Sequence, residues 1–231
     1  MSEPVPLVLL TGYSRGIGQA TALALSQRDV RLALFGRKSD AAEETLIELR
    51  KVGVSLRAYD VELGSPESIA SGLVELSRDQ GTPDCVINNA GVIERRPIEE
   101  LSCSSWDQQL AVNLRAPFLI VRGLLARMKQ RKIGRFVQVG SIASTLGTAS
   151  ASAYCASKWG LVGFTKCLAE ELRDTGLSTV AVLPGSVDTQ MLVGSGFTPR
   201  MTAEEVAKTL VYFALDAPLS HNGAIIEMFG T

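Results

Sequence analysis

The sequence Thr11-Gly12-Tyr13-Ser14-Arg15-Gly16-Ile17-Gly18 lies between a short apolar run at 6–10 and a segment at 16–28 with helical character. Glycine lets the main chain turn sharply and approach a ligand closely. The N-terminus of the helix that follows adds N–H donors and a favourable dipole for an anion. The spacing is Gly-x3-Gly-x-Gly rather than Gly-x-Gly-x-x-Gly. Its place between a first strand and a first helix predicts a turn that binds the pyrophosphate of a dinucleotide.

Short apolar runs alternate with longer amphipathic segments along the rest of the chain. The predicted strands are 6–10, 30–35, 54–59, 84–87, 135–139, 178–183 and 224–229, and the predicted helices are 16–28, 40–52, 66–80, 104–130, 153–174 and 202–215. Continuous apolar strands are typical of a sheet that is covered on both faces. The alternation predicts βαβ units and an α/β fold: a doubly wound, Rossmann-type three-layer sandwich with a seven-stranded parallel sheet.

Size and composition indicate one ordinary globular domain. The chain has 231 residues, of which 46% are apolar and 20% charged, so we expect a single domain over 1–231 that carries both the cofactor and the substrate sites. The net charge of −1 gives no basic surface for nucleic acid or an anionic membrane. No apolar run reaches the ~18 residues of a membrane span, and the N-terminus has no basic region of a signal peptide. We therefore expect a cytoplasmic protein.

Cysteine and histidine usage argues against disulfides and against a metal site. The four cysteines, Cys85, Cys103, Cys155 and Cys167, show no C-x-x-C spacing, and three of them fall in segments predicted to be buried strand or helix. Reduced structural cysteines are expected. His221 is the single histidine, so a metal site built on histidines is not expected, and a Ser-His-Asp site would depend on that one residue.

Charge near the second strand bears on the choice of dinucleotide. Folds that prefer NAD usually place an Asp or Glu there to bind the ribose 2′-hydroxyl. This strand instead ends in Phe35-Gly36-Arg37-Lys38, and Arg15 lies in the glycine turn. Converging cations suit a 2′-phosphate, which arginine binds through two hydrogen bonds. The sequence favours NADP(H) over NAD(H), although the same cations also fit a solvated loop.

Tyr154 and Lys158 are four residues apart in the predicted helix 153–174. Residues at this spacing lie on one helical face, where an ammonium stabilises a phenolate. An unperturbed tyrosine has a pKa of about 10, so lowering it would let Tyr154 exchange protons at neutral pH. The spacing alone is equally that of a half-buried phenol beside an extended lysine chain.

These motifs together resemble the short-chain dehydrogenase/reductase family, across nearly the whole chain. The resemblance assigns the catalytic residues Asn113, Ser141, Tyr154 and Lys158. The cofactor-binding residues that it implies are Gly12, Ser14, Arg15, Gly16, Ile17, Gly18, Arg37, Asp60, Val61, Asn89, Ala90, Gly91, Tyr154, Lys158, Pro184, Gly185, Val187 and Thr189. The residues that it implies for substrate are Ser141, Tyr154 and Met191.

Each catalytic residue then has an expected role. Tyr154 would be the general acid in reduction and the general base in oxidation, and Lys158 would lower its pKa and bind the nicotinamide ribose. Ser141 would donate a hydrogen bond to the substrate oxygen as charge develops. Asn113, a poor helix former inside a long helix, would mark a kink that holds a water in a proton relay to Lys158. Taken alone, Ser141 is equally a strand-end turn residue and Asn113 an ordinary polar helix residue.

Substrate and partners are less constrained. The chain looks most like the 3-oxoacyl-[acyl-carrier-protein] reductases, which implies a small carbonyl or alcohol substrate, free or on an acyl carrier protein, and a homodimer or homotetramer. Segment 190–200 is expected to form a flexible substrate lid, and Tyr13 to cover the cofactor or the pocket mouth. The cations Arg127, Lys129, Arg131 and Lys132 fit either an acidic carrier protein or a solvated helix end.

Three alternatives remain open at this stage. A related enzyme would act on another ketone, a sugar or a steroid-like alcohol. A non-catalytic NADP(H)-binding module would regulate a partner, but it has no need of the Asn/Ser/Tyr/Lys set. A methyltransferase-like nucleotide binder would share the sheet and have no use for the Tyr154–Lys158 pair.

Overall fold

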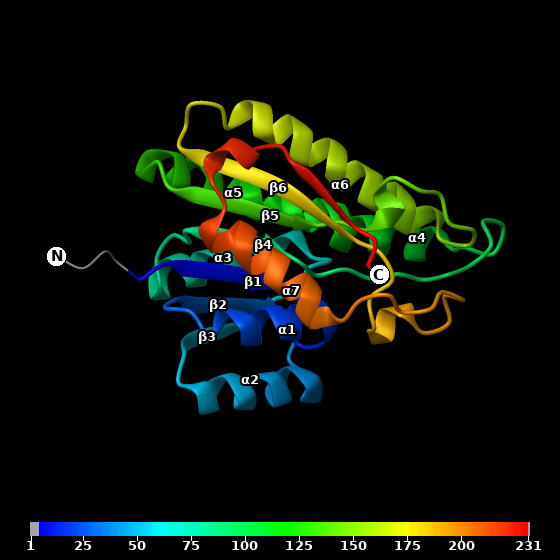
Figure 1. The fold of residues 1–231 in the computed structure, drawn as a ribbon, viewed down its shortest axis with the longest axis horizontal. Helices are drawn as coiled ribbons and strands as arrows, with labels where there is room; N and C mark the ends of the chain where they lie inside the picture. Colours follow the sequence, from blue (N-terminus) through cyan, green and yellow to red (C-terminus); the bar gives the residue numbers. More distant parts are fainter. Residues whose placement is uncertain (1–4, 231) are drawn as a thin grey trace.

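Seven parallel strands form one sheet in the order β3-β2-β1-β4-β5-β6-β7 (Figure 1). The computed structural model describes residues 5–230. The strands are β1 (Leu7–Thr11), β2 (Arg31–Gly36), β3 (Ser55–Asp60), β4 (Cys85–Asn88), β5 (Gly134–Val139), β6 (Leu177–Pro184) and β7 (Ile225–Met228). The order reverses between β1 and β4, and a ligand crevice in such sheets lies beyond the strand ends at this point. The predicted seven-stranded parallel sheet is confirmed.

Helices cover both faces of the sheet, which confirms the three-layer arrangement. Helices α1 (Gly16–Leu25), α2 (Asp40–Val52) and α7 (Ala203–Val211) pack in one hydrophobic cluster. On the other face, α3 (Pro66–Asp79), α5 (Ala116–Arg131) and α6 (Ser152–Glu171) pack in a second cluster. All five residues of β1 are buried, because apolar side chains of this central strand meet a helical layer on each side.

The long helix predicted at 104–130 is interrupted by a wide turn. It consists of α4 (Cys103–Leu110), the π-helix η1 (Ala111–Arg115) and α5. A π-turn inserts one extra residue into the helical ladder and is often found at functional sites. Among the described residues, the stretch Cys103–Arg131 is the one helix that is long and apolar enough to cross a membrane, but half of its apolar window is buried inside the protein. A core helix of a soluble protein has these same properties.

Other helix ends differ from the prediction by a few residues. Helix α1 ends at Leu25 rather than at 28, and the segment predicted at 202–215 is α7 followed by the π-helix η4 (Tyr212–Asp216). Three short 3-10 helices were not predicted: η2 (Ile142–Ser144), η3 (Gln190–Leu192) and η5 (Leu219–His221). Such single turns carry little sequence signal, because few residues and no hydrophobic period define them.

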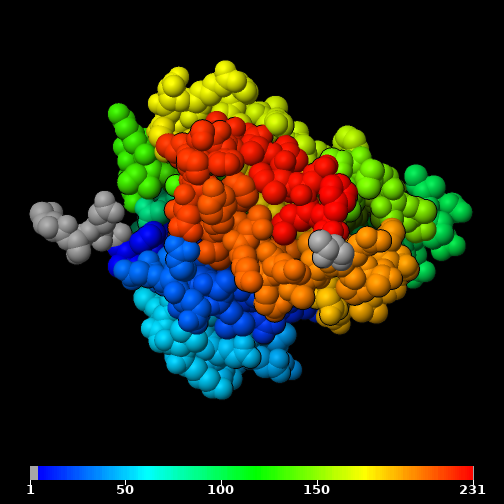
Figure 2. Space-filling model, viewed as in Figure 1, coloured from blue at the N-terminus to red at the C-terminus, as the bar shows by residue number. Residues whose placement is uncertain are grey.

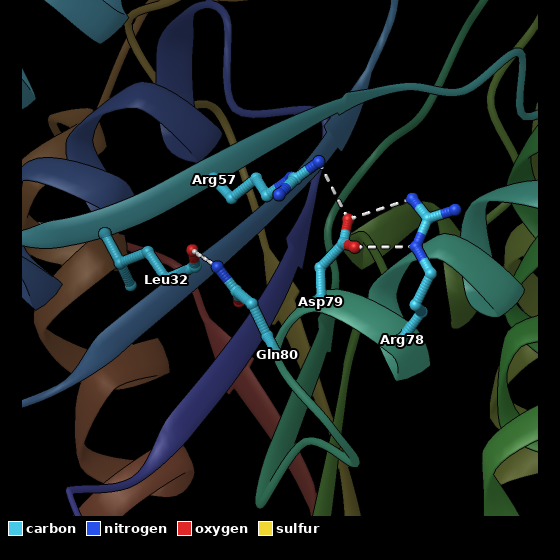
Figure 3. A network of polar contacts seen from close by, with 5 residues as sticks. All are labelled: Leu32, Arg57, Arg78, Asp79 and Gln80. Atoms are coloured by element: carbon cyan, nitrogen blue, oxygen red, sulfur yellow. Dashed lines mark hydrogen bonds and ion pairs between the residues drawn. The ribbon is translucent and has the colours of Figure 1, made fainter.

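A polar network holds the end of α3 against the edge of the sheet (Figure 3). Asp79 forms an ion pair with Arg57 of the edge strand β3 at 2.9 Å and accepts a hydrogen bond from Arg78 at 2.8 Å. Gln80 donates its side-chain amide to the Leu32 carbonyl oxygen at 3.4 Å. Since α3 leads into the amino end of β4, this network lies away from the carboxyl ends of the strands.

The cysteines depart from the prediction in their burial. All four are free, but only Cys85, in β4, is buried. Cys103 and Cys167 are exposed, and Cys155 is half-buried. The prediction of buried segments concerned Cys85, Cys155 and Cys167. It is wrong for Cys167, which lies on an outward position of α6, because membership of a helix does not by itself decide which side faces the core.

Candidate active site

The predicted site residues gather at the carboxyl edge of the sheet, on the right in Figure 1. The glycine turn follows β1, Arg37 follows β2, Asn89 follows β4 and Ser141 follows β5. The segment from Gly185 to Thr189 follows β6. The structure therefore brings together residues from five strand ends, on both sides of the point where the strand order reverses.

Close approach of two loops explains the glycines of the turn. Gly12 and Gly16 have φ of +70° and +55°, which side chains other than glycine rarely adopt. A Cβ on Gly12 would lie 2.8 Å from the Cα of Ala90, and one on Gly18 would lie 1.9 Å from the carbonyl oxygen of Gly12. Much of the glycine requirement thus comes from packing of the turn on itself and on the segment after β4.

Thr11 and Asn89 bind these two loops together. The Thr11 hydroxyl accepts from the main-chain N–H groups of Asn89 and Ala90, both at 3.0 Å. The Asn89 amide donates to the carbonyl oxygens of Thr11 and Gly12, again at 3.0 Å. Sequence reasoning gave Thr11 no role. Its position as the last residue of the first strand was the available signal.

Helix α1 begins without a capping side chain, as α5 and α6 also do. The side chains of Ser39, Ser65, Ser102 and Thr202 cap α2, α3, α4 and α7. Arg15, at the N-cap of α1, makes no such hydrogen bond. The first-turn N–H groups of α1 are therefore not used by a capping side chain, and a pyrophosphate oxygen can accept from them. This arrangement fits the predicted dinucleotide.

The cations predicted to bind a 2′-phosphate have partners in the structure. Arg37 lies 3.6 Å from Glu62, and Lys38 lies 4.0 Å from Asp60. Arg15 donates to the side-chain oxygen of Gln190 at 2.7 Å. All three contacts are exposed, where ion pairs contribute little and exchange readily with other partners. Acidic side chains thus lie beside these cations: Asp60, which the sequence assigned to the cofactor site, and Glu62, which it did not single out.

Two side chains near these cations turn inward, and for Tyr13 this contradicts the prediction. Tyr13 was expected to cover the cofactor or the pocket mouth, but it is only 3% exposed and belongs to the core. A Cβ on Gly36 would lie 3.2 Å from its ring, so the phenol fills the space beneath the end of β2. The Val61 side chain is 1% exposed and packs in the core, so its main chain alone is left to face a ligand. Burial raises the pKa of Tyr13.

Asn113 lies in the π-helix and binds the main chain after β4. Its side-chain oxygen accepts from the Val92 N–H at 2.8 Å, and its amide donates to the Val92 carbonyl oxygen at 2.9 Å. The amide also donates to the Ser157 hydroxyl at 3.0 Å. The predicted irregularity at Asn113 is present, and these bonds give it a positioning role that the sequence did not reveal. The predicted water relay stays a prediction.

Ser141, Tyr154 and Lys158 converge beneath the strand end. The main chain of Ser141 is fixed by a capping box with Ser144 at the start of η2. Tyr154 is 9% exposed and Lys158 3% exposed, both on one face of α6. The Ser141 side chain lies close enough to the Tyr154 phenol to lower its pKa. The serine hydroxyl and the phenol thus point at a common space in which a substrate oxygen can accept hydrogen bonds from both.

The pKa of Tyr154 does not follow the sequence prediction. Burial raises this pKa above 10, while the Ser141 hydrogen bond and the positive charge of Arg95 act to lower it. Burial also lowers the pKa of Lys158, to about 8. The expected lowering by Lys158 is absent because the ammonium is itself desolvated and donates to the Val139 carbonyl oxygen at 2.7 Å. Desolvation, which has no sequence signature, dominates both groups.

The predicted lid runs over the carboxyl edge beside the segment after β4. Its short helix η3 presents Met191, which is exposed, and two glycines with positive φ follow, Gly194 and Gly196. Arg95 donates to the Met191 carbonyl oxygen at 3.2 Å. In Figure 2 the orange lid lies next to green chain at the right-hand end of the molecule. The sequence analysis singled out Met191 and passed over Arg95.

The basic cluster on α5 lies at the opposite end of the sheet. Arg127 and Arg131 donate to Ser77 and Asp84, and Lys129 donates to the Glu171 carbonyl oxygen. Helix α5 ends where β5 begins, at the amino edge of the strands. A partner bound there would be separated from Tyr154 by the length of the sheet. The geometry therefore favours the interpretation of these cations as a solvated helix end over a binding site for a carrier protein.

Comparison with known proteins gives a consistent family. A family model described as short chain dehydrogenase matches residues 6–196. A 3-oxoacyl-[acyl-carrier-protein] reductase of Pseudomonas aeruginosa is 31% identical over 242 residues, covering 100% of this chain and 98% of the relative. D-threitol dehydrogenase of Mycolicibacterium smegmatis is 30% identical over 237 residues, covering 97% and 91%.

A solved structure from Beutenbergia cavernae has the same fold. It is described as a candidate NAD(P)-dependent gluconate 5-dehydrogenase with NADP bound at low occupancy. It superposes with a TM-score of 0.88 at 29% identity and covers 96% of this chain and 94% of its own. The resemblance found in the sequence is thereby confirmed: the chain belongs to the short-chain dehydrogenase family and is an oxidoreductase.

Proposed function

We propose that this protein interconverts a carbonyl and a secondary alcohol with NADP(H) as cofactor, and that one domain over 1–231 holds both sites. Short-chain dehydrogenases use a nicotinamide dinucleotide. The observation that carries the proposal is the buried Tyr154, whose phenol lies near the Ser141 side chain and one helical turn from the buried Lys158. This arrangement lies at the carboxyl edge that also carries the glycine turn.

Each residue of the site has a physical role in this proposal. The nicotinamide supplies or accepts the hydride. Tyr154 gives a proton to the carbonyl oxygen in reduction and takes it back in oxidation. Ser141 stabilises the negative charge that develops on that oxygen. Lys158 places a positive charge beside the phenol. Asn113 holds the Val92 main chain next to Lys158, since the side chains of Asn113 and Lys158 both border Gly91.

The cofactor is held by residues from four strand ends. The free N–H groups at the start of α1 would bind the pyrophosphate, and Arg15 and Arg37 the 2′-phosphate, in exchange for their exposed contacts with Gln190 and Glu62. The central part of the cofactor would be lined by Asn89, Ala90 and Gly91. The nicotinamide would be bordered by Pro184, the last residue of β6, and by Gly185, Val187 and Thr189 after it.

The first candidate substrate is a 3-oxoacyl thioester, free or on an acyl carrier protein. It is supported by the reductase of Pseudomonas aeruginosa, which matches over the whole chain. A second candidate is a polyol or sugar acid, supported by the relatives named for D-threitol and gluconate. Exposed Met191 in the lid is placed to contact either class.

Assembly as a homodimer or homotetramer in the cytoplasm completes the proposal. Large apolar side chains are exposed on neighbouring helices: Trp106 on α4, Phe118 on α5 and Trp159 on α6. A groove of about 960 Å³ between these helices is lined by Leu114, Phe118 and Phe164. Exposed apolar surface of this kind favours contact with another protein surface, and a second copy is the partner that the family resemblance implies.

Following the absorbance of NADPH against a panel of carbonyl compounds tests the proposal. The panel contains β-ketoacyl thioesters, diketones, oxo acids and keto sugars, each also offered with NADH. Oxidation of NADPH by one compound class supports the proposal and names the class. Tight NADPH binding with no turnover of any compound would instead favour a regulatory binding module, the alternative from a different functional class.

A further inference from the structure

Arg95 is held over the active site by its neighbours on the chain. Both polar groups of the Val92 main chain bind Asn113. The Arg96 N–H donates to the Ser150 carbonyl oxygen at 2.9 Å. Between these anchors, Ile93 packs in the small apolar cluster that contains Tyr154. The main chain on both sides of Arg95 is therefore fixed against the machinery of the site.

The guanidinium of Arg95 reaches from this segment to the lid. It is half-buried and donates a hydrogen bond to the Met191 carbonyl oxygen at 3.2 Å. Within residues 5–230, no carboxylate lies within 4 Å of it, whereas its neighbour Arg96 pairs with Glu94 at 3.5 Å. A guanidinium has five N–H donors in a planar fork. Since its hydrogen bond to Met191 uses one of these donors, the others are available to a ligand.

The charge of Arg95 acts on the catalytic phenol. Arg95 is the charged residue that lowers the pKa of Tyr154, against the larger effect of burial. A charge acts in this way on a buried group only from nearby, because solvent screens distant charges. The guanidinium that is bonded to the lid therefore also lies near the phenol.

We propose that Arg95 binds an anionic oxygen group of the substrate, a carboxylate, a few atoms from the carbonyl that Tyr154 protonates. The planar fork of arginine matches the two oxygens of such a group. An anion there also compensates a cation that is half-buried without a carboxylate partner. The inference rests on the proposed carbonyl–alcohol reaction and narrows its substrate. Among the candidates above, it favours oxo acids and their hydroxy acids over neutral thioesters.

The proposed role of Arg95 is tested by the binding of ketones to the complex of the enzyme with NADP⁺. No turnover occurs in this complex, because the oxidised cofactor has no hydride to give to a ketone. Calorimetry would compare 3-oxobutanoate with its methyl ester, and dihydroxyacetone phosphate with dihydroxyacetone. The first pair tests a carboxylate and the second a phosphate, which the same fork would bind. The variants are Arg95→Gln and, as a control on the adjacent exposed arginine, Arg96→Gln.

We expect the wild type to bind 3-oxobutanoate more tightly than its methyl ester, whatever the result for the phosphate pair. Arg95→Gln should weaken binding of the anion by about 10- to 100-fold, the range for a hydrogen bond to a charged group, and leave the neutral partner unchanged. Arg96→Gln should change neither. A preference confined to the phosphate pair would overturn the assignment to a carboxylate.

Two other results would overturn the inference. The first is equal binding of anion and neutral partner by the wild type. The second is an equal loss for both partners in Arg95→Gln, which would mean that Arg95 only holds the lid through Met191. Failure of the proposed function gives a different result, because NADPH would then be oxidised by no carbonyl compound whatever the binding data show.

Discussion

The Lys158 ammonium lies 5.7 Å from the centre of the Tyr154 ring and donates its hydrogen bond to the Val139 carbonyl oxygen. The pair therefore shares a helical face, but the hydrogen bond of the lysine goes to the end of β5 and not to the phenol. Burial raises the pKa of the tyrosine and lowers that of the lysine. In both groups it favours the neutral form, and local charges have to oppose it.

Removing the Tyr154 hydroxyl should stop the chemistry and spare cofactor binding. We expect Tyr154→Phe to lower kcat by at least ~100-fold, within the range that general acid–base catalysis supplies. The dissociation constant of NADPH should change little, because the ring and its packing remain. Tyr212→Phe, at an exposed tyrosine on the opposite helical layer, is the matched control. Near-normal turnover in Tyr154→Phe would refute its role as the proton donor.

The buried lysine should make stability depend on pH. The pKa of Lys158 is about 8 in the folded protein and 10.5 ordinarily. Between these values the unfolded chain binds more protons, so stability rises with pH. The free energy of unfolding of the wild type, relative to Lys158→Met, should increase by about 2 kcal/mol from pH 7 to pH 10. Urea titrations of both proteins at several pH values measure it, and a constant difference would show that Lys158 titrates normally.

Reversal of charge at Arg37 should change the KM for NADPH more than the KM for NADH. Arg37 is exposed and lies near Glu62, so Arg37→Asp places two acids where a 2′-phosphate is proposed to bind. We expect the KM for NADPH to rise at least ~10-fold, the loss of one charge-assisted contact, with a much smaller effect on NADH. Arg173→Asp is a control at an exposed, paired arginine at the end of α6. Equal changes for NADPH and NADH would disprove the assignment to NADP(H).

The residues that sequence reasoning located were those fixed by topology. Strand ends determine where Ser141 and Asn89 lie, and helical spacing puts Tyr154 and Lys158 on one face of α6. The inward turn of Tyr13 and the reach of Arg95 to Met191 depend on side-chain conformation and on the path of two loops. Neither feature is marked in the sequence by a hydrophobic period or by a motif with a fixed spacing. The direction of the Tyr154 pKa was missed for a related reason, since burial is a property of the folded whole.

The contact between Gly18 and Gly12 allows a last test, of whether the packing of the glycine turn is needed for cofactor binding. A substitution at Gly18 disturbs this packing, whereas one at an uncrowded glycine introduces backbone strain alone. A Cβ on Gly18 would lie 1.9 Å from the Gly12 carbonyl oxygen, so Gly18→Ala must displace the turn. We expect at least ~10-fold weaker NADPH binding and a loss of stability of about 1–3 kcal/mol, as for overpacking in a core.

Gly53→Ala is the matched control for this substitution. Gly53 has a φ of +82° at the end of α2 and open space around its Cβ position. Alanine there should cost about 1 kcal/mol of stability through backbone strain alone and leave NADPH binding unchanged. Chemical denaturation and a fluorescence titration of NADPH give both quantities for both variants. Normal NADPH affinity in Gly18→Ala would mean that the turn tolerates displacement, and that the N–H groups at the start of α1 do not bind the pyrophosphate.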